Sequence, residues 1–150
     1  MFVGDDDETV LADGHHTADA LQIAAAVLLV SAARMDDSVD TAELERIERL
    51  LVDRFALTPT EAESLAALAE REAHGASDYW RYARLVKDGF SPDERVEMIE
   101  MLWEVAYADG EVHHQEANLV RRVAGLIYVP DRDSGAARKR VAARIKSDRA

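Results

Sequence analysis

Apolar residues recur every three or four positions along most of the chain, the spacing that places them on one face of an α-helix. Glycines, prolines and acidic clusters separate these runs, and no stretch alternates as a half-buried strand would. The pattern predicts an all-α, single-domain bundle of about seven helices. The first run is apolar on all sides, which is typical of a helix at the centre of a core. Six predicted helices cover residues 17–35, 40–55, 58–75, 77–89, 91–106 and 134–147. Another, before the last of these, ends at residue 127.

Two helix starts carry a complete set of sequence signals, Thr58–Glu61 and Ser91–Glu94. Each has a hydroxyl residue to cap the helix, a proline at the first helical position and a glutamate at the third. Asp40 followed by Glu43 predicts a similar reciprocal cap on an earlier helix, with Val39 as its hydrophobic staple.

The segment Ala33–Glu43 is repeated in Ala106–Glu116. Both read Ala-x-x-Asp-[Asp/Gly]-x-Val-x-x-x-Glu, and each lies between two helical runs. This predicts an internal duplication of a helix–acidic turn–helix unit, with the two copies packed about a pseudo-two-fold axis. Val39 and Val112 would occupy matching, partly buried positions, and the carboxylates beside them would be exposed.

The two acidic turns hold the candidate site chemistry. Clustered carboxylates suit calcium or magnesium, and imidazole shifts the preference toward zinc and other transition metals, so calcium, magnesium, manganese and zinc are the candidate ions. An EF-hand is excluded because Ile47 or Val120 would occupy the loop position that needs a bidentate carboxylate. The candidate ligands are Asp36, Asp37, Asp40 and Glu43 in the first turn and Asp109, Glu111, His113 and Glu116 in the second.

The same residues also have a purely structural interpretation. A glutamate at the third helical position caps the backbone and complements the helix dipole without any metal. The residues alone therefore leave metal binding and simple capping open as alternatives. A weaker alternative is a metal-dependent hydrolase, in which His113 or His114 with Glu111 supplies a base beside an open coordination position. No nucleophile motif or phosphate-binding loop is recognised, so a non-enzymatic protein is predicted.

Composition narrows the classes of partner. The formal net charge of −12 repels phosphate, which excludes a nucleic-acid binder and favours metal ions and protein partners. The absence of cysteine excludes disulfides and thiolate metal sites. The basic stretch Arg138–Arg140, with Arg144 and Lys146, is predicted to complement a helix C-terminal dipole.

Residues 1–16 are predicted to be a flexible acidic arm, and residues 17–150 the helical domain. The start has no secretory signal, and the most apolar stretch, 20–33, is shorter than the about 20 residues that span a bilayer. A cytoplasmic protein without membrane insertion is therefore expected. Trp80 and Trp103 fall on apolar helix faces and are predicted to be core; alternatively, Trp80 with neighbouring tyrosines forms an exposed partner surface.

The segment Tyr107–Val112, continued to Glu116, resembles the signature of the TerB family of tellurite-resistance proteins, and the first unit matches its earlier copy. Residues 126–133 are also similar to TerB-like domains, including those of DjlA-type membrane-anchored co-chaperones. The first copy departs from the motif, because Asp37 stands where the second copy has Gly110.

The resemblance implies an all-helical TerB-like fold, a cytoplasmic role in tellurite resistance or stress response, and an acidic surface that binds divalent metal. It also implies protein partners, including membrane-associated resistance complexes, and self-association is left open. Carried onto matching positions, the implied metal ligands are Asp36, Glu43, Asp109 and Glu116.

Overall fold

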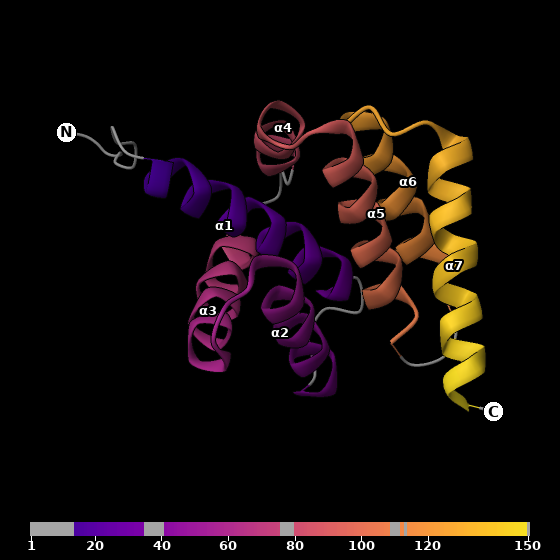
Figure 1. Ribbon diagram of the computed structural model, residues 1–150, viewed down its shortest axis with the longest axis horizontal. Coiled ribbons are helices and arrows are strands. Elements are labelled where there is room, and N and C mark those ends of the chain that lie inside the picture. Colours follow the sequence, from indigo (N-terminus) through magenta and orange to yellow (C-terminus); the bar gives the residue numbers. More distant parts are fainter. Residues whose placement is uncertain (1–13, 35–40, 76–79, 109–111, 113, 150) are drawn as a thin grey trace.

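The computed structural model contains seven α-helices and no strand within the part of the chain that it describes, residues 14–34, 41–75, 80–108, 112 and 114–149 (Figure 1). The all-α prediction is confirmed. The helices are α1 (Gly14–Ala33), α2 (Thr41–Phe55), α3 (Pro59–Gly75), α4 (Trp80–Gly89), α5 (Pro92–Ala106), α6 (His114–Leu126) and α7 (Asp131–Arg149).

Two helix starts differ from the predicted ones. Helix α1 begins at Gly14, so residues 14–16, which were predicted to belong to the flexible arm, are helical. Helix α7 begins at Asp131 rather than at 134, because the Ser134 N–H already donates to the Pro130 carbonyl over 3.0 Å. Acidic residues in the first turn of α7 also complement its dipole. Helix α4 begins at Trp80, and the predicted start at 77–78 lies outside the described residues.

Helix α1 forms the centre of the core, as its apolar composition predicted. The residues 24–30 are all buried, and so are Ala32 and Ala33. This is possible because α2, α3, α4, α5 and α6 all pack against α1. Figure 1 shows α1 crossing between α4 on one side and α2 and α3 on the other, with its C-terminal end beside α5.

Helix α5 is a second central element. Its residues Met98, Ile99, Leu102 and Trp103 are buried, and α7 packs along it (Figure 1). Helices α1 and α5 contact each other directly; in addition, α1 contacts α6 and α2 contacts α5. These reciprocal contacts are those that a two-fold relation between the units would need, and the duplication itself stays a prediction.

The reciprocal caps predicted for α3 and α5 are confirmed. The Glu61 N–H donates to the Thr58 hydroxyl (3.1 Å), and the Glu61 carboxylate accepts from the Thr58 N–H (2.9 Å). Ser91 and Glu94 make the same pair of bonds at 3.2 and 2.7 Å. The hydrogen bond from the Ser91 backbone holds the pKa of Glu94 below its ordinary value. Both helix starts are therefore determined by local sequence.

The break between α6 and α7 is a Schellman turn. The Val129 N–H donates to the Ala124 carbonyl (2.8 Å) and the Tyr128 N–H to the Gly125 carbonyl (3.3 Å). Tyr128 has a φ of 63°, in the left-handed region where glycine is the usual residue. A non-glycine residue there costs about 1–2 kcal/mol.

The two tryptophans have opposite environments. Trp103 is 2% exposed and its indole N–H donates to the Ser134 carbonyl over 3.2 Å, which confirms the predicted core position. Trp80 is 49% exposed, so its predicted core position is wrong. Tyr82, Ala83 and Val86 form the buried face of α4 instead, and Trp80, the first residue of the helix, lies outside that face.

Among the described residues, no helix is both long enough and apolar enough to cross a membrane.

Candidate functional site

Of the eight predicted metal ligands, the structure describes Glu43 and Glu116. Each is the third residue of its helix, α2 or α6, immediately after one of the acidic turns. The other six, Asp36, Asp37, Asp40, Asp109, Glu111 and His113, lie outside the described residues.

The two described carboxylates differ in burial. Glu43 is half-buried, whereas Glu116 is 3% exposed and lies among the buried residues of α6. The expectation that the carboxylates of the turns are exposed is therefore wrong for Glu116. Both glutamates have interaction partners in the structure, which agrees with the rule that buried charges are paired or coordinate metals.

Val112 lies between the second acidic turn and α6. It is half-buried and packs against the core, which confirms its predicted position. Its counterpart Val39 lies outside the described residues. The chain is therefore attached to the core before and after residues 109–111, by the buried Ala106 at the end of α5 and by Val112.

The described donor set is compatible with a hard cation but incomplete. Carboxylate oxygens are the ligands that calcium and magnesium prefer, and Glu43 and Glu116 supply this chemistry. No group of three or more histidine, aspartate or glutamate side chains suited to a metal ion occurs within the described ranges. The metal site thus stays a prediction that depends on the turn residues themselves.

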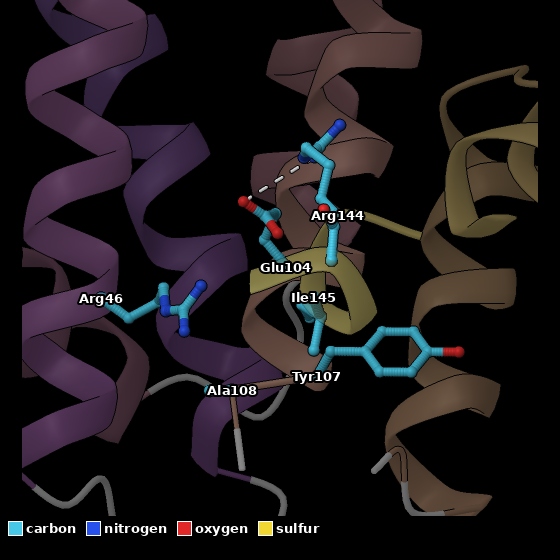
Figure 2. Close-up of a pocket in the computed structure, with 7 residues that line it drawn as sticks. Arg46, Glu104, Tyr107, Ala108, Arg144 and Ile145 are labelled. Carbon is cyan, nitrogen blue, oxygen red and sulfur yellow. Dashed lines mark ion pairs between the residues drawn. The ribbon is translucent and has the colours of Figure 1, made fainter. Parts of the chain in front are cut away.

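A pocket of about 540 Å³ lies between the two helix–turn–helix units and is lined by residues of both (Figure 2). Arg46 reaches it from the second turn of α2, and Ala108, the residue before Asp109, lines it at the end of α5. Residues of α2 and of the segment just after α5 therefore meet in one cavity, and α7 lines a third side of it. The lining residues are Arg46, Glu104, Tyr107, Ala108, Arg144, Ile145 and Ser147.

Two arginines, Arg46 and Arg144, and one glutamate, Glu104, are the charged residues that line this pocket. Figure 2 shows the Arg46 side chain entering from α2, and Arg144 from α7 beside Glu104 of α5. The Arg144 guanidinium lies 3.8 Å from the Glu104 carboxylate and 2.8 Å from that of Glu100. Arg140 also contacts Glu100, at 2.9 Å.

These ion pairs correct the interpretation of the C-terminal basic stretch. Arg140 and Arg144 lie within α7 and pair with glutamates of α5. Arg138 of the same stretch lies over the Trp103 ring at 4.7 Å and donates to the Tyr107 hydroxyl over 3.2 Å. The basic stretch therefore attaches α7 to α5.

Sequence reasoning missed the pocket, although part of its signal was present. Glu97, Glu100 and Glu104 recur at helical spacing on α5, and Arg140 and Arg144 do so on α7. The two rows have opposite charges and the same helical spacing, which indicates that α5 and α7 are adjacent. Nothing in the local sequence indicates that Arg46, far away along the chain, lies at the same cavity.

Comparison with known proteins agrees with the fold and with the motif. The family model described as tellurite resistance protein TerB matches residues 22–139, a span that includes both acidic turns and all or part of every helix. Neither the comparison with curated proteins nor that with solved structures gave a significant match. Because the family model covers well over half of the sequence, the chain belongs to the TerB family of tellurite-resistance proteins.

Proposed function

We propose that this TerB domain is a non-enzymatic, cytoplasmic interaction module whose acidic turns bind a divalent cation and whose surface docks onto other proteins of resistance complexes. Family membership relates the domain to tellurite resistance. The proposal adds the ion, the absence of catalysis and the protein partners.

The burial of Glu116 is the observation that carries the metal part of the proposal. This carboxylate is 3% exposed and directly follows a turn that contains Asp109 and Glu111. A carboxylate charge kept away from water is costly unless it is paired or coordinates a metal. A divalent cation at the turn would add to the pairing that Glu116 already has and would use carboxylates as ligands.

The shared pocket supports a link between the ion and the rest of the surface. Arg46 lies one helical turn after Glu43, and Ala108 directly precedes Asp109. A movement of either acidic turn on binding an ion would therefore shift a residue of the pocket wall. This gives the domain a route by which metal could change the surface that a partner meets.

Thermal unfolding tests the metal part. The protein is treated with a chelator, and its unfolding midpoint is then measured alone and with calcium, magnesium, manganese or zinc. An ion that binds the folded state at about 100 times its dissociation constant adds about 2.7 kcal/mol. We expect one of these ions to raise the midpoint, and the double variant Asp109→Asn with Glu116→Gln to lose that response.

A matched control is Glu61→Gln, which removes a carboxylate from an exposed cap of α3 that belongs to neither acidic turn. It should retain the full metal response. If no ion moves the midpoint of the wild-type protein, the metal part of the proposal fails.

A metal-free structural adaptor is the second candidate, and one observation favours it. Glu61 and Glu94 show that this chain uses glutamate at the third helical position as a backbone cap. Glu43 and Glu116 occupy the same position in α2 and α6. On this alternative, Glu43→Gln and Glu116→Gln are both neutral with every ion, because glutamine can still close the cap.

A further inference from the structure

An exposed surface on α4 and at the end of α6 combines two aromatic rings with two cations. We call it the aromatic–basic patch and define it by Trp80, Arg84, Lys87 and Tyr128. Trp80, Arg84 and Lys87 are spaced by four and three residues, which places them on one face of α4. The Lys87 ammonium lies 4.9 Å from the centre of the Tyr128 ring, so α6 extends the same surface.

Each cation of the patch contacts a ring. The Arg84 guanidinium lies 6.0 Å from the centre of the Trp80 ring, at the outer limit of a cation–π contact, and Lys87 lies closer to Tyr128. Trp80 remains 49% exposed and Tyr128 70% exposed, so most of each ring is still available to a ligand. Tryptophan, tyrosine and arginine are the residues that most often dominate binding energy at protein interfaces.

Folding does not account for the tyrosine at position 128. Its backbone is in the left-handed region, where glycine would carry no steric penalty, and its side chain is largely in water. The chain therefore keeps an aromatic residue at a strained position from which folding gains little. Strained residues of this kind cluster at functional sites.

The charge of the patch indicates what it would bind. The whole chain has a formal charge of −12, whereas this surface presents Arg84 and Lys87, with Asp88 as the acid 3.6 Å from Lys87. An acidic ligand is repelled by the molecule as a whole and attracted at this place, which would orient it on approach. The exposed rings in turn suit apolar side chains.

We propose that the aromatic–basic patch is the docking site for an acidic segment of a partner protein, one in which aspartates or glutamates alternate with leucine or phenylalanine. The proposal rests on the interaction function above and identifies the surface and the partner chemistry that this function would use. It does not depend on metal binding.

Fluorescence anisotropy with a defined probe tests the proposal. The probe is a short labelled peptide that alternates Asp or Glu with Leu or Phe, and its control carries Asn and Gln in place of the acids. We expect saturable binding of the acidic peptide only, weakened by added salt because surface charges contribute to it. Tyr128→Gly and Arg84→Glu should each weaken binding by about tenfold or more.

Matched variants on other faces should leave binding unchanged. Leu85→Ala removes an exposed apolar side chain from a different face of α4. Arg49→Glu makes the same charge reversal as Arg84→Glu at an exposed position of α2. The proposal is overturned if the acidic peptide fails to bind, if the amide peptide binds equally well, or if the two control variants weaken binding as much as the patch variants.

Two further measurements separate other occupants from the one proposed. Vesicles of phosphatidylserine that bind the protein through Tyr128 while the peptide does not would make the patch a lipid-binding surface and contradict the proposal. Sedimentation that shows self-association abolished by Tyr128→Gly would make the occupant a second copy of this chain, which also contradicts it.

The stability of Tyr128→Gly tests the strain argument without any ligand. We expect this variant to unfold at a higher temperature than the wild-type protein while binding the peptide less well. A lower unfolding temperature would mean that folding requires the tyrosine, and it would overturn the inference. If the wild-type protein does not bind the acidic peptide but responds to metal, the patch is wrong and the metal part of the proposed function stands. If the wild-type protein binds the peptide and no ion changes its unfolding midpoint, only the metal part is rejected.

Discussion

The two helix–turn–helix units differ most where their surroundings differ. In the alignment that pairs Ala33 with Ala106, Val27 of α1 corresponds to Glu100 of α5. Val27 is buried in a helix that five others surround, whereas Glu100 is paired with Arg140 and Arg144 of α7. Positions that face the shared core are apolar in both units, and Ile47 and Val120 are both buried. The comparison indicates that the helices packed against each unit, more than the repeated motif, determine which residue types lie on the faces turned away from the shared core.

The turn glutamates show the reverse pattern in burial, because the carboxylate of the second unit is the less exposed one. Glu43 and Glu116 hold the same place in the repeated pattern, yet Glu43 is half-buried and Glu116 is buried. The second unit therefore has the more charged first helix and also the more deeply buried turn carboxylate. If only one turn binds metal tightly, this difference favours the second.

The largest expected effect comes from exchanging Val27 and Glu100. Val27→Glu would place a charge at a fully buried position, at a cost of about 3–5 kcal/mol, the range found when a buried charge lacks a partner. Glu100→Val would lose only two half-exposed ion pairs, each worth about 0–1 kcal/mol. Urea melts of both variants measure the difference. Similar losses of unfolding free energy in the two variants would show that the neighbouring helices do not determine the residue types at these positions.

Val112→Asp tests how firmly the second turn is attached to the core. Val112 is half-buried against core residues, so a charge there should cost about 1–3 kcal/mol. Val112→Thr, which keeps the shape and adds one hydroxyl, should cost less. A melt in which Val112→Asp matches the wild-type protein would show that the turn makes no stabilising contact through this residue.

A smaller effect should distinguish the two turn glutamates in metal-free buffer. Glu116→Gln should leave the stability of the metal-free protein unchanged or raise it by no more than about 1 kcal/mol, because glutamine keeps the size of the side chain, can still cap the helix and removes the desolvation cost of a buried charge. Glu43→Gln should change stability by less than about 0.5 kcal/mol, as is usual at more exposed positions. If Glu116→Gln destabilises the metal-free protein, that carboxylate is a structural anchor and the assignment of the site is wrong.

Local sequence predicted those features that local chemistry determines. The caps at Thr58 and Ser91, the central position of α1 and the break near Tyr128 each follow from residues within one or two helical turns. The start of α7 was missed because Pro130 was interpreted only as a break, although a proline is also common at helix starts.

Features that depend on distant packing could not be predicted. Glu43 and Glu116 have the same local pattern, and only the tertiary surroundings bury one more than the other. The exposure of Trp80 follows from which face of the short helix α4 meets the core. The pocket requires α2, α5 and α7 to meet, which no local pattern specifies.

Calorimetric titration of the chelated protein with calcium, magnesium, manganese and zinc decides whether the acidic turns bind a divalent cation. The account predicts that one of these ions gives saturable heat with a defined stoichiometry, that Glu116→Gln reduces its affinity more than Glu43→Gln does, and that Glu61→Gln has no effect. The account would be contradicted if none of the four ions gave saturable heat, or if Glu61→Gln reduced the affinity as much as Glu116→Gln.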